Sequence, residues 1–195
     1  MNPQKPNILP EWADVIVRFQ PGDERETAEK EIMLDLIAQL GDGILRRENA
    51  FAHMTASSII VNPERTRTLM AFHRIYNSWS WTGGHADGES DFESIARREA
   101  QEESGISGLV RLGNGPASIE ILPVWAHTKR GKAVGSHLHL NVSYLFEADD
   151  KLPLRTCEDE NSAVGWIEID KLADSVSEPP MLPIYERLLS RANDC

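Results

Sequence analysis

Three glutamates crowd onto one turn of a predicted helix that spans residues 91–104, and this crowding limits how the chain can fold around them. Residues three and four positions apart are neighbours on a helix, so Glu99 faces both Glu102 and Glu103. Each like-charge pair at this spacing costs about 0.2–0.5 kcal/mol. The cluster fits either a solvated acidic face or a site for a hard cation, because Mg²⁺ and Mn²⁺ prefer carboxylate oxygens.

The rest of the chain alternates between strand and helix patterns. Short runs rich in β-branched and aromatic residues predict strands near residues 54–62, 67–73, 118–127, 137–148 and 162–170. Apolar residues at three-and-four spacing predict helices near residues 23–45, 91–104 and 181–193, with Gly41 and Gly43 ending or interrupting the first. A polar loop with three basic residues is expected at 128–136. This order predicts an α/β fold with helices on both sides of a mixed sheet.

The net charge and the composition argue against some classes of binding partner. The net charge of −11 argues against nucleic acid and against an anionic membrane surface, since both select basic faces. A small phosphorylated substrate stays compatible, because a bound divalent cation inverts the local field. The chain shows no signal-peptide pattern and no apolar run long enough to cross a bilayer, so a cytoplasmic protein is expected. Two cysteines are too few for a disulfide framework.

The segment "GGHADGESDFESIARREAQEESGI" resembles the Nudix box. Eight fixed positions of that pattern are in register here: Gly84, Arg98, Glu99, Ala100, Glu102, Glu103, Gly105 and Ile106. The resemblance implies a Nudix (MutT-like) fold, an α/β/α sandwich with a mixed sheet. It assigns residues 51–195 to that domain and leaves residues 1–50 as an N-terminal helical extension. One position departs from the pattern: Ser90 stands where a glutamate is due, and Glu89 is expected to support the box instead.

The resemblance also implies an activity. Nudix enzymes are pyrophosphohydrolases that cleave a nucleoside diphosphate linked to another moiety, with Mg²⁺ or Mn²⁺ as cofactor. It implies Glu99, Glu103 and the main-chain carbonyl of Gly84 as metal ligands, with Glu102 as a further ligand. A homodimer is a family-level expectation.

The same resemblance implies roles for other residues of the box and for a residue outside it. Arg98 is expected to fix a box carboxylate through a charge-assisted hydrogen bond. The general base is either Glu160, which precedes the last predicted strand, or the box residue Glu102.

Candidate substrate contacts follow from the place of five residues in such a fold: His85, His137, His139, Lys129 and Arg130. For the histidines the alternative is a structural role, and for the two cations it is a solvated loop. His53 and His73 are interpreted as structural, and the sequence holds no local His/Cys zinc pattern.

Two other functions are compatible with a Nudix fold. A non-catalytic nucleotide sensor usually loses box glutamates, and all three are present here. A relative of isopentenyl-diphosphate isomerase would carry an active-site cysteine in the stretch that holds Gly83 and Gly84. The two cysteines lie elsewhere, at Cys157 and Cys195, so both alternatives rank below the hydrolase.

Overall fold

The computed structural model of the chain describes residues 9–74, 77–129, 131–157 and 161–195. It divides into two compact units. Unit 1 consists of Met1–Thr55, His85–Phe92 and Ser118–Val142. Unit 2 consists of Ala56–Gly84, Glu93–Ala117 and Ser143–Cys195.

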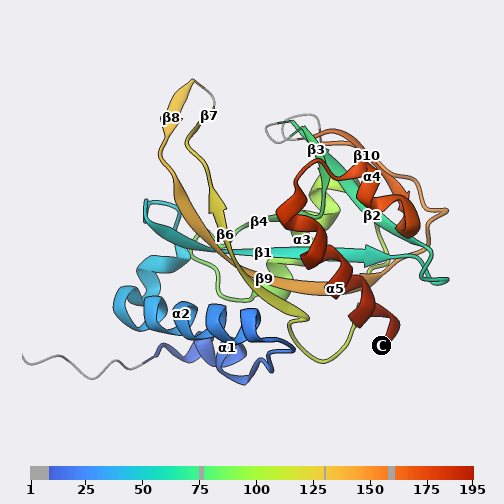
Figure 1. The fold of residues 1–195 in the computed structure, drawn as a ribbon. Coiled ribbons are helices and arrows are strands. Elements are labelled where there is room, and N and C mark those ends of the chain that lie inside the picture. Colours follow the sequence, from blue (N-terminus) through green and yellow to red (C-terminus); the bar gives the residue numbers. More distant parts are fainter. Residues whose placement is uncertain (1–8, 75–76, 130, 158–160) are drawn as a thin grey trace, which may run out of the picture. The chain divides into compact units, whose positions relative to one another are not determined.

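Strands dominate the architecture (Figure 1). The strands are β1 (Ala52–Val61), β2 (Arg67–His73), β3 (Ser78–Ser80), β4 (Thr82–His85), β5 (Val110–Leu112), β6 (Ser118–Val124), β7 (His127–Lys129), β8 (Lys132–Val134), β9 (His137–Glu147) and β10 (Asn161–Glu168). The main sheet has the order β10-β2-β1-β9-β5, with β3 paired to β2, β4 to β1 and β6 to β9. Strands β7 and β8 form a separate two-stranded ladder, which projects as a narrow hairpin in Figure 1.

Helices occupy the ends and the middle of the chain. They are α1 (Asp14–Arg18), α2 (Glu24–Leu40), α3 (Phe92–Ser104), α4 (Leu172–Ser175) and α5 (Leu182–Asn193), with single 3₁₀ turns η1 (Glu11–Ala13), η2 (Gly41–Leu45), η3 (Ile169–Lys171) and η4 (Pro179–Met181). In the described part of the chain, no helix combines the length and the apolarity that crossing a membrane requires. The predicted α/β class and the N-terminal helix are confirmed.

Unit 2 is built around β2. Two of the predicted strands form a hairpin, with Ile60 opposite Leu69 across β1 and β2, and β10 pairs with the other edge of β2. Figure 1 shows α5 in front of these strands and α3 behind them. Each helix turns an apolar stripe inward, α3 through Ile95 and Ala100 and α5 through Ile184, Tyr185, Leu188 and Leu189, all of which are buried.

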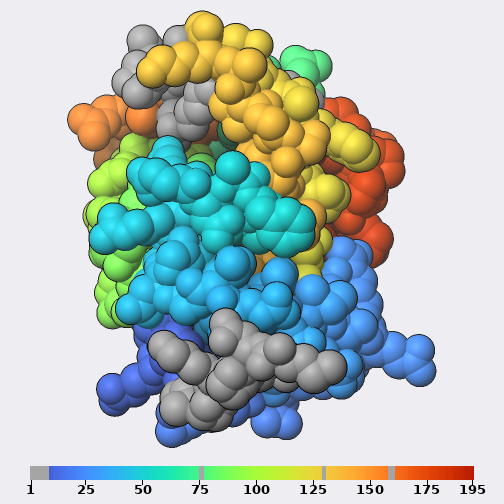
Figure 2. All heavy atoms as spheres, turned by 90° about the vertical axis from the view of Figure 1, so that its left-hand side faces the viewer, coloured from blue at the N-terminus to red at the C-terminus, as the bar shows by residue number. Residues whose placement is uncertain are grey.

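Unit 1 holds α2 against β6. Asp23 caps the helix by accepting a hydrogen bond from the Glu26 amide at 2.7 Å, and the Glu26 carboxylate reaches back to the Gly22 amide at 2.7 Å. This reciprocal arrangement is a capping box. The second oxygen of the fully buried Glu26 accepts from the Ser118 hydroxyl at 2.7 Å on β6. In Figure 2, α2 (blue) lies beside η2 and the start of β1 (cyan).

Gly41 ends the first long helix, as expected: α2 stops at Leu40, where Gly41 adopts a positive φ of 56°, and the remaining residues to Leu45 form a 3₁₀ turn. Two other local features differ from the expectation. The basic loop at 128–136 contains the β7–β8 ladder, closed by Gly131 with φ of 76°. Strand β5 was not predicted, because three residues carry too short a pattern to identify.

Candidate functional site

The main-chain bend at Gly83 and Gly84 meets the acidic face of α3 inside unit 2. A Cβ atom added to Gly84 would lie 2.3 Å from Cδ of Glu99 and 2.5 Å from its Oε2. The Glu99 carboxylate therefore lies directly against the backbone of β4, and no residue except glycine fits at position 84 without displacing it. This close approach explains the glycine that starts the box pattern.

Glu103 is the most buried acid of the cluster, with 6% of its surface exposed. Its Oε1 accepts a hydrogen bond from the Gly83 amide at 3.0 Å, and its Oε2 accepts from Nδ2 of Asn161 at 2.6 Å. Hydrogen bonds to both oxygens stabilise the ionised form of a buried carboxylate. The side chain is thus held as an anion with a fixed orientation.

Arg98 lies between the other two glutamates of the cluster. Its Nη2 is 3.8 Å from Oε1 of Glu99, and its Nε is 3.9 Å from Oε1 of Glu102. Both distances are longer than a hydrogen bond allows. Through these atoms, Arg98 compensates the negative charge of the two carboxylates by electrostatic attraction. Glu102 is exposed on the solvent side of α3. The charge-assisted hydrogen bond predicted for Arg98 stays a prediction.

The carboxylate cluster is defined as Glu99, Glu102 and Glu103. It places hard oxygen donors beside the end of strand β4. Such donors suit Mg²⁺ or Mn²⁺, which take one or two carboxylates and complete their shell with water and phosphate oxygens. A bound cation would also remove the repulsion between Glu99 and its two neighbours on the helix. The residues present therefore fit a divalent cation.

The remaining predicted site residues fall elsewhere. Glu89 is an exposed residue of unit 1, where its amide closes a turn on the Ala86 carbonyl at 2.9 Å. Arg130 and Glu160 lie outside the described residues, and so does the side chain of Lys129. Their roles stay predictions.

Histidines from three strands come together in unit 1. The rings of His53 on β1, His85 on β4 and His139 on β9 lie with centroids 5.0 Å apart in each pair. His137 stacks on His53 at 4.8 Å, and its Nε2 is 3.2 Å from Nε2 of His139. The sequence predicted His137 and His139 as substrate contacts, but it did not predict that they meet His53.

Burial disfavours the charged forms of two of these rings, His139 and His53. Burial, followed by the charges of His85, His53 and His137, lowers the pKa of His139 to about 2. Burial is also the largest cause that lowers the pKa of His53, against a backbone hydrogen bond that raises it. Neutral imidazoles have a ring nitrogen with a lone pair, which is the form that binds metals.

Asn161 and His53 are the residues that sequence reasoning missed. Asn161 begins β10 directly after the acidic residues 158–160, and nothing in its local pattern marks it as a partner of Glu103. His53 lies on a continuously buried strand, where a histidine is interpreted as a core residue.

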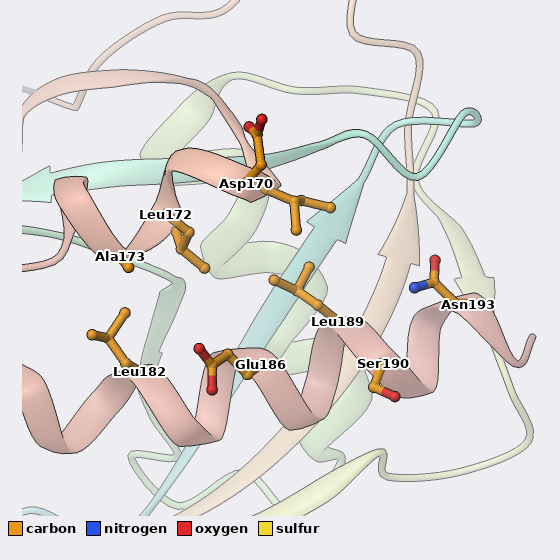
Figure 3. A pocket seen from close by; sticks show the side chains of 9 residues that line it. Asp170, Leu172, Ala173, Leu182, Glu186, Leu189, Ser190 and Asn193 are labelled. Carbon is orange, nitrogen blue, oxygen red and sulfur yellow. The ribbon is translucent and has the colours of Figure 1, made fainter.

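A pocket of about 380 Å³ in unit 2 lies between α5 and the η3–α4 segment (Figure 3). Leu172, Leu182 and Leu189 give it an apolar wall, and Asp170 and Glu186 lie at its edge. None of the predicted site residues lines it. This pocket is therefore separate from the carboxylate cluster.

Comparison with known proteins points to one family. The profile of the NUDIX domain matches residues 52–189. A Nudix hydrolase from M. Smegmatis, RenU, superposes with a TM-score of 0.52 at 16% identity, covering 72% of this chain and 84% of that one. A C. elegans Ap4A hydrolase binary complex gives 0.48 at 19% identity over 70% and 97% of the two chains. A NUDIX-family hydrolase from Clostridium perfringens gives 0.47 at 18% identity over 70% and 95%. No curated protein matches the sequence significantly.

Proposed function

The chain belongs to the NUDIX domain family, and we propose that it is a divalent-metal-dependent pyrophosphohydrolase. The proposed substrate is a nucleoside diphosphate linked to another moiety. The Nudix resemblance and fold inferred from the sequence are confirmed by the family match and by the likeness to RenU. The activity itself rests on the site.

One observation carries the proposal: the Glu99 carboxylate lies against the Gly84 backbone while Glu103 is fixed by Gly83 and Asn161. Glu99, Glu102, Glu103 and the Gly84 carbonyl are the groups that would hold Mg²⁺ or Mn²⁺. A bound divalent cation neutralises phosphoryl oxygens and lowers the pKa of bound water. The anionic substrate needs that neutralisation, since the cluster alone would repel it.

The protein's own groups have distinct parts in this proposal. Glu103 keeps its position because two hydrogen bonds fix it, and Glu99 can lie against the strand because Gly84 has no side chain. Arg98 lowers the repulsion between Glu99 and Glu102 in the absence of substrate. The proposed general base is Glu160, which precedes β10 in the sequence, and the exposed Glu102 is its competitor for that role.

The test is a substrate panel with Mg²⁺ or Mn²⁺, scored by release of phosphate or nucleoside monophosphate. We expect turnover of at least one nucleoside diphosphate derivative and a fall of about 100-fold or more in Glu99→Gln, because metal neutralisation contributes several kcal/mol. Glu31→Gln is the matched control, since it removes the same charge from an exposed position on α2. A panel inert with both metals would favour the non-catalytic sensor. Retained activity in Glu99→Gln would refute the metal-ligand assignment.

Location and assembly belong to the same proposal. A cytoplasmic protein and a homodimer are expectations from the sequence and the family, and size-exclusion chromatography with light scattering tests the second.

A further inference from the structure

The histidines of unit 1 form a chemically different group from the carboxylates. His53, His137 and His139 each offer one ring nitrogen, and these three atoms lie within 4.8 Å of one another. Imidazole nitrogen suits Zn²⁺ and other borderline transition metals, whereas Mg²⁺ takes oxygen ligands. The donor set therefore selects a different class of cation from the one proposed for the carboxylate cluster.

Backbone hydrogen bonds fix the tautomers of two of these rings. Nδ1 of His53 lies 3.1 Å from the Asn49 carbonyl, and Nδ1 of His137 lies 2.9 Å from the Gly135 carbonyl. A carbonyl only accepts, so each Nδ1 carries the proton and each Nε2 of the neutral ring carries the lone pair. Metal-binding histidines commonly donate their second nitrogen to a backbone carbonyl in this way.

The buried Nε2 of His53 is the unexplained atom of the cluster. His53 is 4% exposed, and within the described residues its Nε2 has no hydrogen-bond partner. A buried polar atom without a hydrogen-bond partner destabilises the folded protein. A cation bound at this nitrogen would satisfy it.

The distance between the two histidines on β9 suits a shared cation. Their Nε2 atoms are 3.2 Å apart. For Zn–N bonds of about 2.0–2.1 Å, tetrahedral geometry places two ligand nitrogens roughly 3.3–3.4 Å apart. In the metal-free protein one proton lies between these nitrogens, donated by His139 to the lone pair of His137. A metal ion can take the place of that proton.

We propose that His53, His137 and His139 form a binding site for a divalent transition metal of the Zn²⁺ class. Three protein nitrogens leave a fourth position for water or another ligand, which is the ligand count of catalytic zinc sites. His85, whose ring is 5.0 Å from both His53 and His139, lies beside these three ligands.

The experiment titrates the full-length, metal-stripped protein with Zn²⁺, and separately with Co²⁺, in excess Mg²⁺. The excess Mg²⁺ occupies carboxylate oxygens but not imidazoles, so binding reports the histidine site. We expect one equivalent of Zn²⁺ and a Co²⁺ spectrum of low-coordinate, nitrogen-bound metal. Changing groups that merely orient a ligand lowers affinity about 10–100-fold, so loss of a ligand in His137→Ala should exceed that range.

Four variants make the result decisive. His137→Ala and His139→Ala test two positions that are partly exposed, so loss of binding does not depend on the fully packed His53. His73→Gln removes a histidine of unit 2 and should bind Zn²⁺ normally. Glu99→Gln should also bind Zn²⁺ normally while losing hydrolysis, which separates this site from the proposed activity. Unchanged affinity in both alanine variants, or no Zn²⁺ binding by the parent protein, overturns the proposal.

Discussion

The side-chain amide of Asn161 donates a 2.6 Å hydrogen bond to the buried carboxylate of Glu103, joining the first residue of β10 to the last turn of α3. The other Glu103 oxygen accepts from the Gly83 amide. The second polar atom of Asn161, Oδ1, is buried and has no hydrogen-bond partner among the described residues. The amide is therefore used for one purpose, which is to hold Glu103.

Asn161→Leu should destabilise the protein by about 1–3 kcal/mol, because a buried carboxylate loses one of its hydrogen bonds. Asn161→Asp should cost more, since it places a second carboxylate against Glu103. Urea unfolding measures both effects. Ser162→Ala, at the exposed neighbouring position, is the control and should stay within about 0.5 kcal/mol of the parent. Equal stability of all three variants would contradict a holding role for Asn161.

Glu103→Gln should keep the fold and lose hydrolysis. The glutamine retains an oxygen for the Gly83 amide, and a turned-over Asn161 amide offers its unused Oδ1 to the new Nε2 donor. We expect a change in unfolding free energy below about 1.5 kcal/mol and turnover reduced by about 100-fold or more. Urea unfolding and the substrate panel measure the two quantities on one sample. Full activity in this variant would remove Glu103 from the set of metal ligands.

Substitution by alanine should mainly lower activity at Gly84 and mainly lower stability at Gly83. In Gly84→Ala the new methyl group meets the flexible end of Glu99, which can swing away, so activity should fall far more than stability. In Gly83→Ala it meets the Ala56 carbonyl at 2.7 Å and the Ser57 Cα at 2.9 Å, so stability should fall because backbone cannot swing away.

Thermal unfolding and turnover together separate these two outcomes. Gly43→Ala is the control, because a Cβ there meets nothing within 4 Å. If Gly84→Ala hydrolyses substrate at the parental rate, the position of Glu99 against the strand does not matter for the reaction.

The Arg47–Asp87 ion pair predicts a small stability change at acid pH. The hydrogen bond from Arg47 is the main cause that lowers the pKa of Asp87 from 3.8. A depressed carboxyl pKa adds stability above the unfolded-state pKa, and this stability is lost as pH falls through the folded-state value. Both side chains are 47% exposed, so the contribution at pH 7 stays within about 1 kcal/mol.

Arg47→Gln should raise the pKa of Asp87 toward 3.8, and its stability deficit should vanish at pH values below the depressed pKa. Carbon-detected NMR of the Asp87 carboxyl group follows the titration, with Arg18→Gln as a control at another exposed arginine. An Asp87 titration that does not move in Arg47→Gln would show that the arginine is not the cause.

The sequence was most informative about features that residues close together in the chain form. Residues from Arg98 to Gly105 form one continuous segment, so helix periodicity and a glycine stop were enough to predict the acidic face of α3. Gly105 ends the helix with φ of 67°, as expected of a C-terminal glycine. The resemblance to the Nudix box implied Gly84 and Glu99 as ligands of one metal, and the fold brings these two residues into contact.

The sequence was least informative where two strands that are far apart in the chain meet. Asn161 reaches Glu103, and His53 reaches His137, through pairings whose register a single sequence does not reveal. Side-chain alternation showed that His137 and His139 share a face, but not which residue of another strand lies opposite. This long-range strand register determines which residues the buried polar groups meet.

The capping box of α2 has a consequence for where the chain can be divided. The family match begins at residue 52, whereas Glu26 binds the Ser118 hydroxyl and Glu29 binds the Ile121 amide on β6. Removing the first fifty residues would take both of these carboxylate acceptors away from β6. In this protein the segment that the NUDIX profile matches is thus shorter than the segment whose hydrogen bonds join α2 to β6.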